Sequence, residues 1–330
     1  MRPPLVDTHQ RTVRDLRLSV TDRCNLRCVY CMPAEGMAWL PKEQLLTYEE
    51  ITRLTRVCLE CGVEAVRLTG GEPTVRADLP ALVRMLYALR PGLDLSLTTN
   101  GLKLPQMADE LREAGLTRVN VSLDTLDRER FHRLARRDRI SEVHAGLAAA
   151  KRVGFQPIKI NAVLMRGFND DEVVPLARWA RDEGFELRFI EWMPLDFEKK
   201  WDRSQLVPAG EILDQLGAAF GITPLENDDP SAPARTFRYN DGVGRVGVIA
   251  SVTRPFCGHC DRIRLTADGQ IRTCLFATKE YDFRTALRNG ASDDEIEQLL
   301  RAAVLRKAPG HLIGSPLFEQ PARGMSAIGG

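Results

Sequence analysis

Residues 15–31 read DLRLSVTDRCNLRCVYC, a short strand-like segment that leads directly into a loop with three cysteines. At its start, apolar residues alternate with polar ones such as Arg17, which is the pattern of a β-strand with one buried face. Cys24, Cys28 and Cys31 follow, separated by three and two residues. Two thiols suffice for a redox pair and a closed zinc site needs four ligands, so a set of three predicts a different kind of site.

Five further strand-like segments follow the first one along the chain. The six expected strands span residues 16–20, 65–69, 94–99, 118–123, 158–163 and 186–191. Amphipathic segments lie between them and several end on glycine, as helices often do. This alternation implies parallel strands with right-handed crossovers. No GxGxxG or P-loop motif follows a strand, so the pattern favours an α/β fold of the incomplete (β/α)6 TIM-like barrel type over a nucleotide-binding open sheet.

The pattern changes after residues 221–236, which are rich in proline, aspartate and small residues. We expect this stretch to be a loop or linker and place a domain boundary near residue 230. Residues 1–230 then form the barrel, and residues 231–330 form a smaller C-terminal region with its own cysteines. The tail RGMSAIGG shows no periodicity, so we expect it to be mobile when nothing binds it.

The chain has 330 residues, with 46 lysines and arginines against 45 aspartates and glutamates. This near balance argues against a general nucleic-acid binder. The N-terminal residues contain no apolar run of signal-peptide length, and no later stretch is long and apolar enough for a membrane span. We therefore expect a cytoplasmic protein without nucleic-acid or membrane partners.

Two of the eight cysteines, Cys58 and Cys61, lie on an expected helix that begins with the capping-box pair Thr47 and Glu50. They continue the apolar stripe of that helix. We expect both to be core residues, because a free cysteine packs as a small hydrophobe. The other six cysteines form two triads, and in a reducing compartment metal ligation is more typical of them than disulfide formation.

The second triad consists of Cys257, Cys260 and Cys274. Three thiolates can hold three irons of a 4Fe–4S cluster and leave the fourth iron open for a small molecule. Zinc is the alternative for either triad, but it needs a fourth ligand. His259 lies inside the CxxC turn, and we expect its side chain to face solvent. Two open-iron clusters are therefore the favoured interpretation.

Polar side chains recur near the carboxyl ends of the expected strands, where chemistry takes place in β/α barrels. They are Arg17, Arg67, Thr98, Ser122 and Lys159. After the second triad, alternation places Arg262 and Arg264 on one face of a strand and Ile263 on the other. The five cations of these two sets are expected to converge between the clusters. Guanidinium groups suit phosphate oxygens, so a polyanionic ligand is expected there.

The first triad, with Tyr30 before its last cysteine, resembles the signature of the radical S-adenosylmethionine (SAM) superfamily. LTGGEP at residues 68–73 resembles the glycine-rich motif of that superfamily. Further stretches narrow the resemblance to the GTP 3′,8-cyclase family, which catalyses the first step of molybdenum cofactor biosynthesis. They are DLRLSVTDRCNLRCVYCMP, RLTGGEPTVR, TTNG, VNVSLDTL, FIEWMP, the second triad with RIR, and the terminal Gly-Gly.

This resemblance implies ligands for each cofactor and for the substrate. The cluster that binds SAM falls on Cys24, Cys28 and Cys31, and the substrate cluster falls on Cys257, Cys260 and Cys274. The implied SAM contacts are Tyr30, Gly71, Ser122 and Met193. The implied GTP contacts are Arg17, Arg67, Thr98, Lys159, Arg262, Ile263 and Arg264. Many relatives carry a lysine two residues before Arg67, where this chain has Ala65, so one phosphate contact departs from the family pattern.

The resemblance also implies a reaction. An adenosyl radical removes hydrogen from C3′ of the GTP ribose, the carbon radical adds to C8 of guanine, and reduction yields (8S)-3′,8-cyclo-7,8-dihydroguanosine 5′-triphosphate. Arg17 is the expected catalytic residue, as donor of the proton or hydrogen that completes the reduction. Gly329 and Gly330 are expected to reach the pocket between the clusters and to meet its cationic residues.

The expected partners are GTP, an electron donor (a flavodoxin-like protein or a chemical reductant), the next-step cyclic pyranopterin monophosphate synthase, and a second copy in a homodimer. One alternative is another two-cluster radical SAM enzyme such as a peptide maturase, although these usually carry a longer, cysteine-richer C-terminal extension. The other is a non-catalytic zinc-binding module that contacts nucleic acid, against which the neutral net charge and the barrel pattern count.

Overall fold

The computed structural model describes residues 2–226 and 229–329. Six strands form the centre of one sheet, and neighbours along the chain pair in parallel. They are β1 (Asp15–Ser19), β2 (Ala65–Thr69), β3 (Asp94–Thr99), β4 (Arg118–Ser122), β5 (Ile158–Leu164) and β6 (Glu186–Glu191). Each begins and ends within one residue of its predicted range, so the predicted series of parallel β/α units is confirmed.

The C-terminal third of the chain extends both edges of this sheet. At one edge, β10 (Arg262–Leu265) pairs in parallel with β1, and β11 (Gln270–Arg272) and β12 (Tyr281–Asp282) follow in antiparallel order. At the other edge, β9 (Arg245–Ile249) pairs in parallel with β6 and antiparallel with β8. The described residues thus build a twelve-stranded sheet in the order β12-β11-β10-β1-β2-β3-β4-β5-β6-β9-β8-β7.

The expected linker at 221–236 is only partly a loop. Its first residues form β7 (Ile222–Pro224), and its last residues begin β8 (Arg235–Tyr239), which pairs antiparallel with β7. Pairing of this hairpin with the edge of the sheet satisfies backbone groups that a free linker would leave to water. Asn227 and Asp228 lie outside the described residues. The domain boundary near residue 230 stays a prediction.

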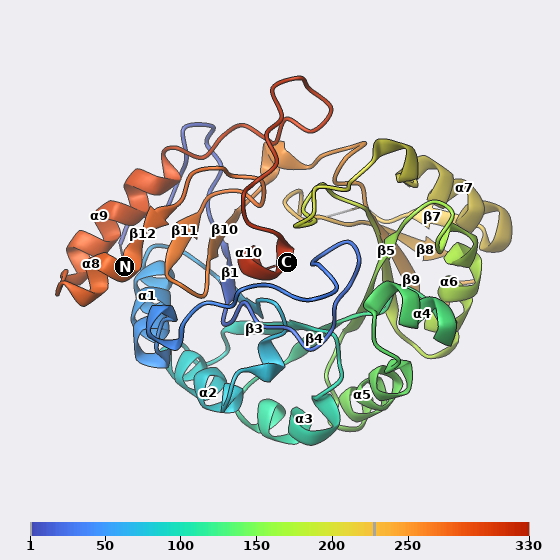
Figure 1. Ribbon diagram of the computed structural model, residues 1–330, viewed down its shortest axis with the longest axis horizontal. Helices are drawn as coiled ribbons and strands as arrows, with labels where there is room; N and C mark the ends of the chain where they lie inside the picture. The colour runs from blue at the N-terminus through green and yellow to red at the C-terminus, as the bar shows by residue number, and fades with distance from the viewer. Residues whose placement is uncertain (1, 227–228, 330) are drawn as a thin grey trace.

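Helices cover the outer face of the central strands in an arc that runs from α1 to α6 (Figure 1). These helices are α1 (Tyr48–Glu60), α2 (Leu79–Leu89), α3 (Leu104–Glu113), α4 (Arg128–Ala135), α5 (Ile140–Arg152) and α6 (Val173–Asp182). Helix α1 begins with the predicted capping box of Thr47 and Glu50. Cys58 and Cys61 are buried in the core that the helices share with the sheet, so their predicted core role is confirmed.

The later helices lie around the C-terminal extension. They are α7 (Ala209–Phe220), α8 (Phe283–Arg288), α9 (Asp293–Val304) and the short α10 (Met325–Ile328). Helix α9 also begins with a capping box, formed by Ser292 and Glu295. None of the helices in the described parts of the chain has the length and apolar character required to cross a lipid bilayer.

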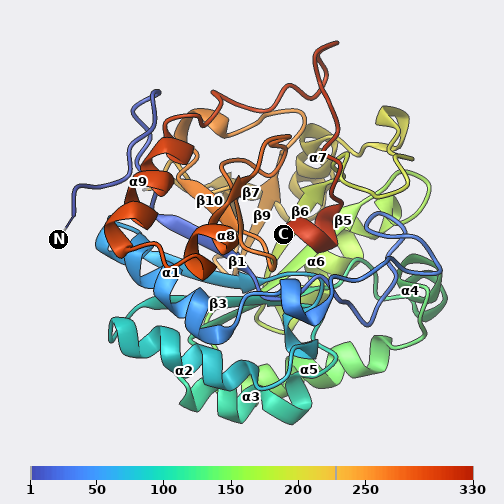
Figure 2. The ribbon, with the colours of Figure 1, turned by 60° about the vertical axis from the view of Figure 1, so that its left-hand side comes forward.

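The prediction of a mobile tail is wrong for the described residues. Helix α10 occupies the middle of the ring of strands and helices, far in sequence from its neighbours (Figures 1 and 2). Ile328 is fully buried in a small apolar cluster with Leu195 and Phe276. The Arg264 guanidinium donates a hydrogen bond to the carbonyl oxygen of Gly329. These contacts hold the tail without any periodic pattern in its sequence. Gly330 lies outside the described residues.

Candidate active site

A row of arginines crosses neighbouring strands at one level of the sheet. Arg264 on β10, Arg17 on β1 and Arg67 on β2 are consecutive register partners. The row continues through Ser96 on β3 to Arg118 on β4. Side chains at the same level of adjacent parallel strands point to the same face, so the backbone register itself brings these guanidinium groups together.

A second row lies one step along the central strands. Thr98 on β3, Asn120 on β4, Lys159 on β5 and Glu186 on β6 are consecutive register partners. The Lys159 ammonium lies 3.4 Å from a Glu186 carboxylate oxygen. Burial and, after it, repulsion from the neighbouring Arg188 nevertheless lower the pKa of Lys159 to about 8. The second row therefore holds a lysine whose charged form is disfavoured even beside Glu186, and which a further anion would stabilise.

Both rows face one large cavity of about 810 Å³. Most of the predicted site residues line it, so the structure brings this set together around one cavity; their roles stay a prediction. They are Arg17, Tyr30, Arg67, Thr98, Ser122, Lys159, Met193, Cys257, Cys260, Arg262, Arg264 and Cys274. Ala65 also lines this cavity, so the position where relatives carry a lysine faces the same space.

Three groups of predicted ligand residues are not among those that line the cavity, and neither is Gly329 of the tail. Ile263 is fully buried in the hydrophobic core, because alternation along β10 turns its side chain away from Arg262 and Arg264. Gly71 packs against the cysteine loop: a Cβ there would lie 2.4 Å from the carbonyl oxygen of Asp22. The cysteines of the first triad are not among the lining residues either, although Tyr30 from the same loop is.

The arginines carry more positive charge than their protein neighbours balance. Arg17 donates to Asp15 at 2.9 Å, but its Nε and the Nε and Nη1 of Arg67 are buried without a hydrogen-bond partner in the described chain. Burial lowers the pKa of Arg264 to about 9, and repulsion from Arg17 adds to the effect. Burial and then repulsion from Arg17 lower the pKa of Arg67 well below its usual value. Buried, unpaired cations are costly, so this site is suited to a polyanion.

The first triad lies on a loop between β1 and α1 that other segments hold in place. The backbone N–H groups of Arg27 and Val29 donate to carbonyl oxygens at the end of α4. The backbone N–H of Leu26 donates to Cys24 Sγ at 3.4 Å. Burial raises the pKa of the Cys24 thiol to about 12, and the nearby Glu72 adds to this rise. Burial also raises the pKa of Cys31 to about 11.

Glu72, in the LTGGEP stretch, ties the β2 loop to the end of β3. Its carboxylate accepts hydrogen bonds from the backbone and hydroxyl of Thr74, from the hydroxyl of Thr99 and from the backbone of Asn100. The neighbouring Gly70 and Gly71 leave no room for a side chain beside the cysteine loop. This motif therefore places the first triad relative to the sheet.

Sequence reasoning missed Asp124, which lies between the first triad and the cavity. It accepts a hydrogen bond from the Tyr30 hydroxyl at 2.7 Å and one from the backbone N–H of Val163 at 2.8 Å. Burial raises the pKa of Asp124 to about 6. A signal was available in the sequence. Asp124 directly follows the predicted strand at 118–123 and is two residues after Ser122, so strand alternation places both side chains on the same face.

Three cations that line the cavity were also missed: Arg14, Arg118 and Arg188. Arg118 forms a two-pronged ion pair with Asp94, and Arg188 donates to Glu186 at 2.9 Å. Alternation within residues 186–191 predicts the inward position of Arg188, but Arg14 and Arg118 lie at strand starts, where the pattern gives little guidance.

The second triad is held from outside the cavity by two buried cations. Arg11 pairs with Asp7 and donates to the carbonyl oxygen of Cys257 at 2.7 Å. Lys307 Nζ lies 3.6 Å from Cys260 Sγ. Burial opposes ionisation of Cys260, but the charges of Lys307 and Arg262 prevail and lower its pKa. His259 is exposed, as predicted.

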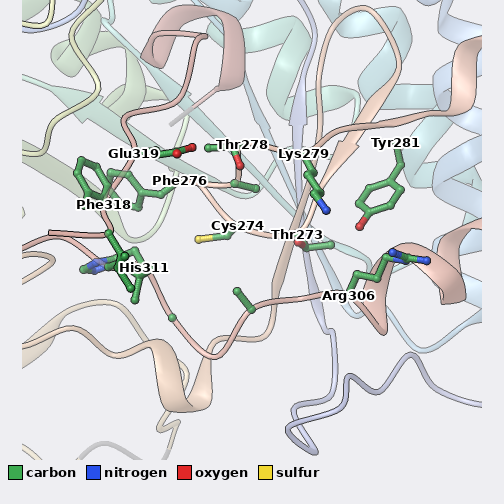
Figure 3. A pocket seen from close by; sticks show the side chains of 15 residues that line it. Thr273, Cys274, Phe276, Thr278, Lys279, Tyr281, Arg306, His311, Phe318 and Glu319 are labelled. Carbon is green, nitrogen blue, oxygen red and sulfur yellow. The ribbon is translucent and has the colours of Figure 1, made fainter. Parts of the chain in front are cut away.

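A smaller cavity of about 310 Å³ opens on the other side of Cys274. Figure 3 shows the Cys274 sulfur between an aromatic side, with Phe318 and His311, and a polar side, with Lys279, Tyr281 and Arg306. Cys274 lines this cavity and the large one. Of the second triad, Cys274 therefore borders both cavities, whereas Cys257 and Cys260 line only the large one.

The residues present fit two 4Fe–4S clusters by their donor chemistry. Each triad supplies three free thiols from short neighbouring segments. The cysteines of the second triad line the large cavity, and Tyr30 reaches it from the loop of the first triad. In the described residues, no three histidine, cysteine, aspartate or glutamate side chains are arranged to hold a single metal ion.

Two family models match the chain in succession. The model of the radical SAM superfamily matches residues 18–180, and the model named Molybdenum Cofactor Synthesis C matches residues 185–313. The GTP 3′,8-cyclase of Mycobacterium sp. (strain KMS) is 54% identical over 328 residues, which cover 99% of this chain and 94% of that protein. The GTP 3′,8-cyclase of Streptomyces coelicolor is 53% identical over 99% of this chain and 96% of that protein.

Solved structures agree with the fold. Streptococcus suis SuiB bound to the precursor peptide SuiA has a TM-score of 0.62 at 15% identity, over 95% of this chain and 76% of that one. Methylornithine synthase has a TM-score of 0.50 at 18% identity, over 63% of this chain and 62% of that one. These likenesses show the fold alone, so the peptide bound to SuiB lends no support to the maturase alternative.

The comparisons confirm the predicted partial-barrel fold, the radical SAM chemistry and the cofactors, namely SAM and two 4Fe–4S clusters. Relatives at this identity over almost the whole chain decide between the alternatives that the sequence left open. The chain belongs to the GTP 3′,8-cyclase family.

Proposed function

We propose that the chain converts GTP into (8S)-3′,8-cyclo-7,8-dihydroguanosine 5′-triphosphate, the first step of molybdenum cofactor biosynthesis. The observation that carries this proposal is the row of Arg264, Arg17 and Arg67 in a cavity that the second triad also lines. Buried guanidinium N–H groups of Arg17 and Arg67 without a hydrogen-bond partner in the described chain favour a triphosphate, and the cavity is large enough for a nucleotide-sized ligand.

The two triads take different ligands in this proposal. Cys24, Cys28 and Cys31 hold the cluster that binds SAM, whose contacts are Tyr30, Gly71, Ser122 and Met193. Cys257, Cys260 and Cys274 hold the cluster that the guanine base approaches. The GTP contacts are Arg17, Arg67, Thr98, Lys159, Arg262 and Arg264, with Ile263 acting through its backbone, since its side chain is buried in the core.

When bound, the first cluster and SAM supply a carbon-centred radical that takes hydrogen from the GTP ribose. The protein residues position the substrate for this step: the arginine row fixes the triphosphate, and the second triad lies on the wall where the base is placed. Arg17 is proposed as the donor of the proton that, together with one electron from the proposed electron donor, completes the reduction. Its guanidinium has a lowered pKa because of burial and of repulsion from Arg262, which makes proton release easier than from an exposed arginine.

The surroundings of the tail support a role in the same step. The carbonyl of Gly329 accepts from Arg264, and a Cβ at Gly329 would lie 2.9 Å from Thr69 Cγ2. The end of the chain thus lies against the strand ends that carry Arg17 and Arg67. We propose that it organises these cations around the substrate.

The partners beyond GTP are proposals that follow from the family. They are an electron donor such as a flavodoxin-like protein, cyclic pyranopterin monophosphate synthase as the next enzyme, and a homodimer partner. A cytoplasmic location is part of the same proposal.

The direct test is anaerobic reconstitution of both clusters followed by incubation with GTP, SAM and dithionite. The expected products are methionine, 5′-deoxyadenosine and a cyclised nucleotide that is an isomer of GTP, identified by mass spectrometry and NMR. ATP in place of GTP serves as the control and should give no cyclised product. Cleavage of SAM without any consumption of GTP would contradict the proposal.

A further inference from the structure

Lys307 is a buried lysine outside the substrate cavity that contacts the second triad. Only 3% of its surface is exposed. Its ammonium group donates to the carbonyl oxygen of Thr273 at 2.9 Å, to the carbonyl oxygen of Arg262, and lies 3.6 Å from Cys260 Sγ. These contacts use all three donors of a lysine ammonium group.

The contacts of Lys307 connect separate parts of the second iron–sulfur site. Cys260 supplies one thiol, Thr273 directly precedes the predicted ligand Cys274, and Arg262 begins β10, the strand that carries Arg264. Lys307 itself follows helix α9, so a segment that is distant in sequence contacts all three of these parts. It does not line the large cavity and therefore acts on the substrate only through the cluster site.

The charge of Lys307 lacks an ordinary partner. In residues 2–226 and 229–329, no carboxylate lies within ion-pair distance of its ammonium group, whose neighbours are two neutral carbonyl groups and a cysteine sulfur. An isolated buried ammonium is costly. A cluster-bound thiolate at Cys260 supplies the missing negative charge, so the surroundings of Lys307 match a cluster better than a free thiol.

We propose that Lys307 is a positioning residue that sets the reduction potential of the second cluster. The inference rests on the proposed function of the second triad as a 4Fe–4S site. Net charge and hydrogen bonds to the cysteine sulfurs tune the potentials of such clusters. One-electron reduction from the 2+ to the 1+ state adds negative charge beside the Lys307 ammonium, which stabilises the reduced form and raises the potential.

The test uses the full chain with Cys24, Cys28 and Cys31 replaced by serine, so that only the second cluster remains. Lys307→Gln removes the charge, and Lys307→Arg keeps it. Lys279→Gln is the matched control, because Lys279 is an exposed lysine of the outer cavity whose charge is screened by water. Each protein is titrated with dithionite and followed by the EPR signal of the reduced cluster.

The expected result is a shift of the midpoint potential to a more negative value in Lys307→Gln, with little change in Lys307→Arg or Lys279→Gln. A retained cluster with an unchanged midpoint in Lys307→Gln would overturn the inference, since a purely structural lysine would alter iron content alone. If the parent protein, with only Cys24, Cys28 and Cys31 replaced by serine, binds no iron, the proposal that the second triad holds a cluster is contradicted instead.

A second measurement covers the case in which Lys307→Gln does not retain its cluster. The parent protein with only its lysines labelled with ¹⁵N is reduced and studied by pulsed EPR. A weak ¹⁵N coupling to the cluster is expected, because the Lys307 nitrogen lies beside Cys260 Sγ. Absence of any lysine coupling would contradict the inference without any mutation of Lys307.

Discussion

The two cysteine triads offer the same three thiols in opposite electrostatic surroundings. The carboxylates of Glu72 and Asp124 lie near the first triad and raise the pKa of its thiols beyond the effect of burial. Lys307 and Arg262 lie near the second triad and lower the pKa of Cys260 against the effect of burial. SAM carries a positive sulfonium group, which suits the carboxylates on the first side. GTP carries a negative triphosphate, which suits Arg262, the cation of the second set that lines the large cavity.

The largest effects should come from removal of either triad. Serine at Cys24, Cys28 and Cys31 should remove about four of roughly eight irons and all SAM cleavage. Serine at the three cysteines of the second triad should remove a similar amount of iron but leave SAM cleavage intact. Iron analysis and 5′-deoxyadenosine assays check both results. Stoichiometric zinc in anaerobically prepared protein would contradict this difference between the triads.

Deletion of Gly329 and Gly330 should abolish cyclisation while both clusters, folding and SAM binding persist. The deletion removes the carbonyl that accepts a hydrogen bond from Arg264, but it leaves Ile328, which anchors α10 in the core. Cluster spectra, circular dichroism and product assays distinguish these effects. A separate peptide ending in MSAIGG should restore part of the activity. Normal turnover by the truncated enzyme would contradict the proposed role of the tail in cyclisation.

Replacement of Arg262 and Arg264 by alanine should weaken GTP binding far more than SAM cleavage. A hydrogen bond to a charged group contributes about 1.5–3 kcal/mol, which corresponds to roughly 10- to 150-fold in affinity per contact. Equilibrium binding of GTP measures the loss, and Arg238→Ala on the hairpin strand β8 is the control. Unchanged affinity in the double variant would place the phosphate site elsewhere.

GTP affinity should fall as the pH rises through about 8, while SAM affinity should change less. The pKa of Lys159 is about 8 because burial and Arg188 disfavour its charged form. GTP binds to the protonated form, so the favourable contact is complete below pH 8 and is lost above it. Lys159→Arg should flatten the profile between pH 7 and 9, since arginine stays charged there. An identical slope in this variant would exclude Lys159 as the cause.

The smallest effect should come from Tyr30→Phe on the side of the first triad. This change removes the hydrogen bond from the tyrosine hydroxyl to Asp124 and keeps the ring. A single hydrogen bond contributes about 0.5–1.5 kcal/mol, so SAM affinity should fall by about 2- to 13-fold. GTP affinity should stay the same. A larger loss of affinity for GTP than for SAM would contradict the assignment of Tyr30 to the SAM side.

The six parallel strands and the helices between them could be predicted because each is indicated by a local sequence pattern. Alternation, glycine helix ends and the capping box at Thr47 each depend on neighbours in sequence, and the predicted strands match the observed ones. The pairing of β10 with β1 depends on residues almost 250 positions apart, and no local pattern encodes it. The tail shows the same limit, since Ile328 is held by distant residues that its own sequence does not reveal.

The site was predicted well where strand alternation and spacing identify a residue, and less well elsewhere. Arg17 and Lys159 point into the cavity as alternation requires. For Ile263, alternation correctly indicated the opposite face, and only the family resemblance placed it at the substrate. Asp124 and Lys307 were not recognised, because their importance arises from contacts with Tyr30 and Cys260 across the fold.

The most direct test of the central claim uses GTP with deuterium at C3′ of the ribose. The reconstituted protein is incubated with this substrate, SAM and dithionite, and the 5′-deoxyadenosine and the nucleotide product are analysed by mass spectrometry. If the cavity between the two triads holds GTP as proposed, one deuterium moves into 5′-deoxyadenosine and the product is a cyclised isomer of GTP that lacks it. Unlabelled 5′-deoxyadenosine alongside consumed GTP would contradict the account.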